Sequence, residues 1–121
     1  MMKIKNYKYY YWTKWLNNTD NIKYGYYSQY IKNNLKIIGF NSIYYDSNNF
    51  FKIDKLSKKY KSNQQWKWLE NEFKKSLINK DKIIFINHIP IGAGEAIPYY
   101  NTKLTLLLEK YNDIILTNLY G

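Results

Sequence analysis

The sequence predicts an α/β layered fold in which a small sheet of mainly parallel strands is flanked by helices. Short, β-branched apolar segments alternate with longer segments whose apolar residues recur at helical spacing. The predicted order is strand, long loop, helix, strand, loop, helix, strand, which is typical of parallel strands joined by right-handed crossovers. A chain of 121 residues forms one domain at most.

The first half of the chain is weakly patterned. Aromatic residues and Leu16 predict a short amphipathic helix over residues 7–17, and LKIIGFN at 35–41 predicts the first strand. Residues 42–62 are rich in Asn, Ser, Lys and Tyr, which predicts a long loop with at most a short turn of helix. A loop of that length in a compact domain is usually functional or disordered.

The second half is patterned more clearly. SNQQ at 62–65 has capping-box spacing and precedes apolar residues at helical intervals, so a helix is predicted over 63–78. A buried strand is predicted at 83–87, an amphipathic helix at 102–111 and a final strand at 114–118. The predicted core combines apolar positions of these elements: Ile37, Trp66, Leu69, Phe73, Ile84, Ile86, Leu104, Leu108 and Ile115.

The strands at 35–41 and 83–87 are apolar on both faces, as in parallel sheets that are covered on both sides. A chain this short cannot easily supply two covering layers. The sequence therefore indicates part of a larger domain.

The formal net charge of +10 is compatible with nucleic-acid binding, but the details favour another explanation. All 19 basic residues are lysines spread through every segment. Arginine, whose planar fork reads phosphate and guanine edges, is absent. Since Lys, Asn, Ile and Tyr have A/T-rich codons, a biased genome explains the composition, and no nucleic-acid partner is expected.

The chain has no cysteine, which excludes disulfides and cysteine-ligated metal sites. This absence mildly favours either a reducing compartment or a chain that lacks the disulfide-bonded parts of its protein. No segment is long and apolar enough to be a transmembrane segment. The basic N-terminus lacks the continuous apolar core of a signal peptide.

The only histidine, His88, lies where the predicted strand 83–87 ends and a loop containing Pro90 and Gly92 begins. The carboxyl ends of buried parallel strands form the edge at which α/β folds bind ligands. From its position alone, a structural or surface role is the commoner one for such a histidine. One histidine without cysteines does not make a transition-metal site, because such sites need three or four ligands.

Other catalytic patterns are missing from the sequence. There is no G-x-S-x-G nucleophile motif of a serine hydrolase. GAGEA at 92–96 lacks the third glycine of a dinucleotide loop and the Lys-Ser/Thr of a phosphate loop.

IIFINHIPIG, followed by a helix and DIILTNLYG, resembles the C-terminal half of a calcineurin-like metallophosphoesterase, and more closely the acid sphingomyelinase-like phosphodiesterases. In that family a strand ends in Gly-His-[Ile/Met]-Pro-Pro-Gly. NHIPIG at 87–92 keeps this pattern, except that Asn87 replaces the first glycine and Ile91 the second proline. A later strand of the family ends in Gly-His-x-His, and Gly121 matches its glycine.

The resemblance extends in consistent order over roughly residues 11–121. The further matching positions are YGYYS at 24–28, LKIIGFNS with Asn41, the pair Asn49-Phe50, and Gln65, Trp68, Leu69 and Glu72 of the predicted helix. The family's upstream Asp-x-His, Gly-Asp and Gly-Asn-His elements and its loop cysteine have no counterpart. Residues 1–121 are therefore expected to form an incomplete metallophosphoesterase catalytic domain that ends at the glycine of the Gly-His-x-His motif.

The resemblance implies a hydrolase that cleaves a phosphodiester, such as a sphingomyelin-like phospholipid, with a water activated by two divalent metal ions, of which zinc is the expected one. His88 is then a ligand of one metal, and the chain alone is expected to be inactive. Asn41, Asn49 and Trp68 are expected to shape the loop and the core. The resemblance further implies a secreted or lysosomal protein.

Two alternatives remain open at this point. The chain could be a non-catalytic homologue of the same fold that acts by binding. It could also be a basic module that binds polyanions, which salt-dependent retention on a polyanion would reveal.

Overall fold

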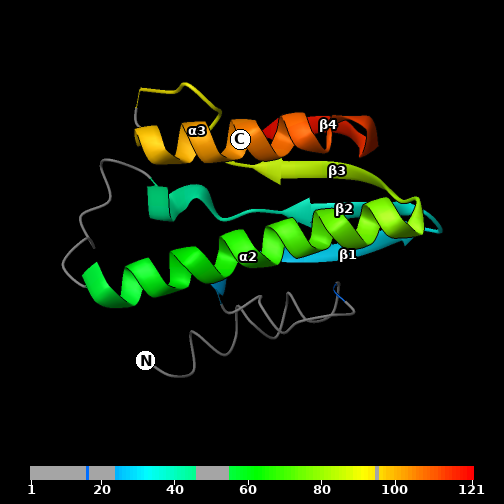
Figure 1. Ribbon diagram of the computed structural model, residues 1–121, viewed down its shortest axis with the longest axis horizontal. Helices are drawn as coiled ribbons and strands as arrows, with labels where there is room; N and C mark the ends of the chain where they lie inside the picture. The colour runs from blue at the N-terminus through cyan, green and yellow to red at the C-terminus, as the bar shows by residue number, and fades with distance from the viewer. Residues whose placement is uncertain (1–15, 17–23, 46–54, 95) are drawn as a thin grey trace.

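The computed structural model describes residues 16, 24–45, 55–94 and 96–121 (Figure 1). The described strands form one sheet in the order β1-β2-β3-β4, with β1 at Tyr27–Lys32, β2 at Leu35–Gly39, β3 at Lys82–Asn87 and β4 at Ile115–Tyr120. The two long helices are α2 at Lys55–Asn79 and α3 at Pro98–Lys110. Short 3-10 segments occupy Ser42–Tyr45 and Asn112–Ile114.

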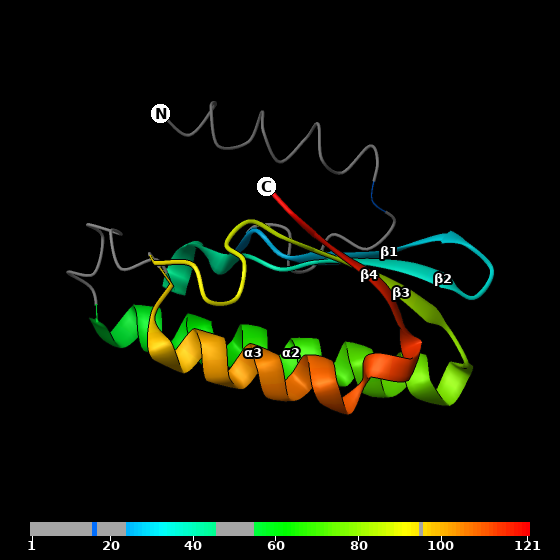
Figure 2. The same ribbon diagram turned by 90° about the horizontal axis from the view of Figure 1, so that it is seen from above.

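The sheet is mainly parallel, which confirms the predicted α/β class. β2, β3 and β4 are parallel neighbours, and α2 and α3 are the crossovers between them. Figure 2 shows both helices along the same face of the sheet. The three predicted strands therefore belong to one sheet, as expected.

β1 was not predicted from the sequence. It pairs antiparallel with β2 through a tight turn in which Asn34 has a φ of 63°. Asparagine tolerates this left-handed conformation better than most residues. β1, with the sequence YSQYIK, lies at the edge of the sheet, and none of its residues is fully buried. Its sequence therefore lacks the alternation of apolar and polar residues that predicts a strand with one buried face.

α2 begins eight residues before the predicted capping box at 62–65. The prediction of a long loop with at most a short turn of helix over 42–62 is wrong for 55–62, which belong to α2, and Ser62 is not an N-cap. The segment KLSKKYKS at 55–62 contains lysines and a leucine, which are good helix formers despite being polar overall. Residues 46–54, and the predicted helix at 7–17 apart from Leu16, lie outside the described residues.

The carboxyl end of α2 is closed by Lys80 in the left-handed conformation, with a φ of 60°. The amide of Lys80 donates to the carbonyl of Leu77 over 3.3 Å, and that of Asp81 donates to the carbonyl of Ser76 over 2.8 Å. This pair of hydrogen bonds is a Schellman motif. It turns the chain directly into β3.

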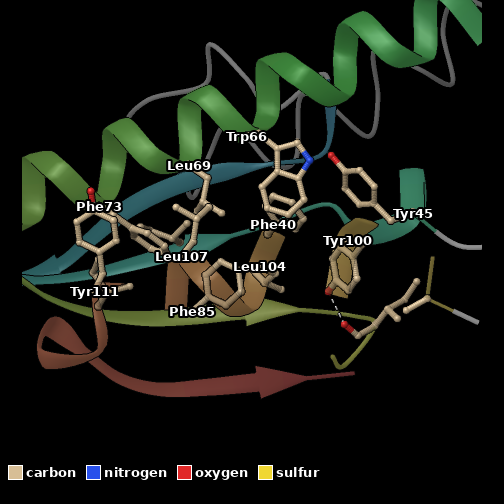
Figure 3. Packing of buried hydrophobic residues seen from close by; sticks show 14 of the residues in the cluster. Phe40, Tyr45, Trp66, Leu69, Phe73, Phe85, Tyr100, Leu104, Leu107 and Tyr111 are labelled. Carbon is tan, nitrogen blue, oxygen red and sulfur yellow. Dashed lines mark hydrogen bonds between the residues drawn. The ribbon is translucent and has the colours of Figure 1, made fainter. Parts of the chain in front are cut away.

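The core lies between the sheet and the two helices, and it is rich in aromatic rings (Figure 3). Phe40 and Trp66 have ring centroids 4.9 Å apart, and Tyr45 lies 5.3 Å from both Trp66 and Tyr100. The predicted core residues Trp66, Leu69, Phe73 and Leu104 are fully buried.

The predicted core positions on β2 and β3 were on the wrong face. Ile38, Ile83 and Phe85 point toward the helices and are fully buried, whereas Ile37, Ile84 and Ile86 are only partly buried. Because both strands are apolar at nearly every position, the pattern does not indicate which face the helices cover. Leu108 and Ile115 are also only partly buried, although both pack against the core.

Candidate metal-binding edge of the sheet

The carboxyl ends of β2, β3 and β4 meet at one edge of the sheet because these strands are parallel. Asn41 follows β2, His88 follows β3 and Gly121 follows β4. The two helices lie on one side of this edge, and the loop from His88 to Ile97 leads from it into α3 (Figure 2).

His88 and Gly121 are neighbours at this edge, as the sequence predicted. A Cβ atom added to Gly121 would lie 2.8 Å from Nδ1 of His88. The amide of Gly121 donates a hydrogen bond to the carbonyl of Asn87 over 3.2 Å. A glycine at position 121 therefore leaves space for the exposed imidazole.

The backbone on both sides of His88 is fixed by hydrogen bonds. The carbonyl of Asn87 accepts from Gly121, and the amide of Ile89 donates to Oγ of Ser42 over 3.1 Å. The carbonyl of Ile89 accepts from Nδ2 of Asn87 over 3.0 Å and from the hydroxyl of Tyr100 over 2.5 Å. The histidine itself is exposed, as is Gly121, whereas the side chains of Ser42, Asn87 and Tyr100 are buried.

Tyr100 is a permanent hydrogen-bond donor at neutral pH. Burial, with a smaller contribution from Tyr120, raises the pKa of Tyr100 to about 12, although its hydrogen bond with Asn87 acts in the opposite direction. The phenol therefore stays protonated throughout the physiological range, and its hydrogen bond to Ile89 does not depend on pH there.

The end of β2 is fixed by Gln65, which is fully buried. Oε1 of Gln65 accepts from the amide of Asn41 over 2.6 Å, and Nε2 donates to the Asn41 carbonyl over 3.0 Å. The Asn41 side chain donates to the carbonyl of Tyr24 and accepts from the amide of Ile43. Asn41 thus shapes the loop, as expected.

The loop after His88 turns away at Gly92. Gly92 has a φ of 84°, a conformation that favours glycine, and its amide donates to Oδ1 of Asn101 over 2.9 Å. The amide of Ile97 donates to the carbonyl of Tyr45 over 3.0 Å. The described part of the predicted loop, residues 42–45, therefore borders the His88 segment.

Two other residues singled out in the sequence do not reach this edge. Trp68 packs on Tyr26, with ring centroids 4.7 Å apart, which agrees with the expected role in packing. Glu72 forms an ion pair with Lys36 over 3.1 Å. Asn49 and Phe50 lie outside the described residues.

The imidazole of His88 is exposed at the carboxyl edge of the parallel strands, and the backbone on both sides of it is held by hydrogen bonds, so its chemistry and placement are compatible with binding a metal ion. The described ranges contain no group of three or more His, Cys, Asp or Glu side chains that could bind a metal ion. The buried carboxylate of Asp81 is engaged instead by the hydroxyl of Tyr30, over 2.6 Å.

A separate cavity lies at the opposite end of the sheet, where β1, β2 and the end of α2 meet. Its volume is about 270 Å³, and it contributes nothing to the His88 edge. The residues that line it are Ser28, Gln29, Tyr30, Lys36, Glu72, Lys75 and Asn79.

The supporting residues Ser42 and Tyr100 were not identified from the sequence. Neither belongs to a local motif, because their hydrogen bonds to Ile89 join segments 47 and 11 positions apart. Gln65 was identified from the sequence as a capping residue and as a position of the family resemblance, but its hydrogen bonds to Asn41 were not predicted. In the described part of the chain, no helix combines the length and apolar character needed to cross a membrane.

No protein-family model matches the chain. The cyclic GMP-AMP phosphodiesterase SMPDL3A of Homo sapiens is 38% identical to it over 96 residues, which is 73% of this chain and 20% of that protein. The Mus musculus and Bos taurus proteins of the same name are 36% and 35% identical over 95 residues. The chain therefore spans about a fifth of the length of the curated relatives it matches. These matches confirm the predicted resemblance: the chain is a relative of the acid sphingomyelinase-like phosphodiesterases.

Proposed function

We propose that this chain contributes part of the active site of a metal-dependent phosphodiesterase, with His88 as a metal ligand. The observation that carries the proposal is the position of His88, whose exposed imidazole lies beside Gly121 at the carboxyl edge of three parallel strands. The relatives named as phosphodiesterases support the class of reaction.

We infer that the 121 residues belong to a larger catalytic domain. Ile37, Ile84 and Ile86 lie on the sheet face opposite the helices and are only partly buried. Apolar parallel strands are normally covered on both faces. The need for further metal ligands supports the same inference, as does the length of the relatives.

Two divalent cations, with zinc the expected ion, would lower the pKa of a water and neutralise charge on the phosphodiester when bound. Within this chain, His88 would present a neutral imidazole nitrogen to one of them. Gly121 leaves space for the ring, and the hydrogen bonds to Asn87 and Ile89 orient the backbone that carries it.

The proposed substrate is a phosphodiester. The relatives are named for cyclic GMP-AMP, which makes a cyclic dinucleotide the first substrate to test, and a sphingomyelin-like phospholipid the second. The discriminating experiment compares the hydrolysis of both by the protein with its complete catalytic domain.

The test measures hydrolysis of bis-p-nitrophenyl phosphate, cyclic GMP-AMP and sphingomyelin before and after chelation. We expect cleavage of at least one substrate, loss of activity with EDTA and recovery with zinc. Activity that survives chelation would contradict the metal-dependent mechanism. If none of the three is cleaved while the protein binds metal, the non-catalytic alternative is the better account.

A further inference from the structure

We propose that Tyr100 and Asn87 are positioning residues for His88, and that they act through the carbonyl group of Ile89. The inference rests on the proposed function, since it assigns the two residues a part in presenting the metal ligand. Both side chains are buried, with 0% and 2% of their surface exposed, whereas His88 is exposed.

The three groups form a closed polar cluster beneath the loop. Nδ2 of Asn87 contacts both the Ile89 carbonyl and the Tyr100 hydroxyl, and the Tyr100 hydroxyl donates to the same carbonyl over 2.5 Å. Asn87 immediately precedes His88 and Ile89 immediately follows it. The cluster therefore fixes the backbone on both sides of the histidine from within the core.

The carbonyl of Ile89 is the only hydrogen-bonding group of its peptide unit. The next residue is Pro90, which has no N–H, so this peptide can be oriented by hydrogen bonds only through its oxygen. Two buried donors converge on that oxygen, one from β3 and one from α3. Their loss would remove the hydrogen bonds that orient this peptide and leave the bond from the Ile89 amide to Ser42 to hold the backbone after His88.

The Asn87 side chain destabilises the folded state, which indicates that its role is more than packing. Its Oδ1 atom is buried and has no hydrogen-bond partner among the described residues. An unsatisfied buried acceptor destabilises the folded state, so an apolar side chain would be the better packing residue. The amide is useful for its donor, which reaches the Ile89 carbonyl. The phosphodiesterase motif has glycine at this position, so the asparagine is a departure from the resembled pattern.

The test compares Tyr100→Phe with Tyr99→Phe, which removes the same hydroxyl from the adjacent, exposed tyrosine. The protein is labelled with ¹⁵N-histidine, and the His88 signals are identified by their absence in His88→Ala. The backbone order parameter of His88 reports its mobility. We expect it to fall from about 0.85 to below about 0.7 in Tyr100→Phe and to stay unchanged in Tyr99→Phe.

Asn87→Ala provides a second variant should Tyr100→Phe fold poorly, and we expect the same increase in mobility. Metal affinity, measured by zinc titration with a competing chelator, should weaken about tenfold in each variant. With saturating zinc, kcat and KM should return close to the wild-type values.

Equal His88 order parameters in Tyr100→Phe, Asn87→Ala and Tyr99→Phe would overturn the positioning role. Failure of the proposed function has a different signature, because His88→Ala would then keep its metal whatever the mobility of the loop. The inference would also be overturned if His88→Ala loses metal while Tyr100→Phe and Asn87→Ala, with a more mobile His88, keep the wild-type metal affinity.

Discussion

Lys36 and Glu72 form an ion pair between β2 and α2 that is almost entirely removed from water. Nζ and Oε2 are 3.1 Å apart, and the side chains are 5% and 9% exposed. Nζ of Lys36 also lies 4.9 Å from the centre of the Tyr30 ring. Glu72 has a second, weaker partner in exposed Lys75, at 3.6 Å. The pair therefore links the helix to the strand that leads to Asn41.

Replacing Glu72 with alanine should destabilise the fold strongly. The change leaves Lys36 buried without its carboxylate, and breaking a buried pair in this way costs about 3–5 kcal/mol. Chemical denaturation measures the loss. Glu70→Ala is the matched control, because the ion pairs of Glu70 with Lys74 and Lys110 in the described part of the chain lie at the surface. This substitution should cost at most about 1 kcal/mol. Equal effects of the two variants would contradict the buried pair.

Gln65→Ala should also destabilise the protein, and more than Gln64→Ala does. Two hydrogen bonds to the Asn41 backbone disappear, which leaves a backbone donor and acceptor without their partners. Such losses amount to about 2–4 kcal/mol in total. The neighbouring Gln64 is partly exposed and is the control at the same helix end. Denaturation midpoints within error of each other would show that the Gln65 contacts contribute little.

Tyr100 should make the fold sensitive to alkali. Its folded pKa of about 12 exceeds the ordinary value of 10.0, so the folded state binds the proton more tightly than the unfolded state. The resulting stability is fully present below pH 10 and is lost as the pH rises through about 12. The loss attributable to Tyr100 should reach about 2–3 kcal/mol.

The measurement is the free energy of unfolding between pH 9 and about 12 for wild type, Tyr100→Phe and Tyr99→Phe. Tyr100→Phe should flatten the alkaline decline, and Tyr99→Phe should retain it. Parallel curves for wild type and Tyr100→Phe would contradict the assignment of the titration to this residue.

Gly121→Ala should displace the His88 imidazole while leaving the fold intact. The added Cβ would lie 2.8 Å from Nδ1, and both residues are exposed, so the ring must move. We expect a shift of the His88 imidazole NMR signals, a change in stability below about 0.5 kcal/mol and metal affinity weakened about tenfold. Gly94→Ala is the matched control, because no described atom lies within 4 Å of a Cβ at that position. Unshifted imidazole signals in Gly121→Ala would contradict the contact.

The membership of β2, β3 and β4 in one mainly parallel sheet could be predicted, as could the shared edge of His88 and Gly121, because both depend on local patterns and general rules. Two strongly apolar strands separated by amphipathic helices indicate parallel pairing, and parallel strands place their carboxyl ends together. The motif at 87–92 then placed the histidine at one of those ends.

The parts that could not be predicted depend on contacts between distant segments. The buried face of β2 and β3 is decided by where α2 and α3 pack, since Ile37 and Ile38 are equally apolar. The contacts of Ser42 and Tyr100 with Ile89 have no sequence signal, because each residue is a common polar or aromatic one far from His88 in the chain. The helical segment 55–62 was missed because lysine-rich helices and loops have similar composition.

The central claim is that His88 binds a catalytic metal ion, and the metal content of the purified protein with its complete catalytic domain tests it most directly. Wild type, His88→Ala and Gly94→Ala are compared by elemental analysis after equilibration with limiting zinc. We predict that His88→Ala loses one metal equivalent of a two-metal site and most of its activity, while its stability changes little and Gly94→Ala matches wild type. Full metal occupancy in His88→Ala would contradict the account.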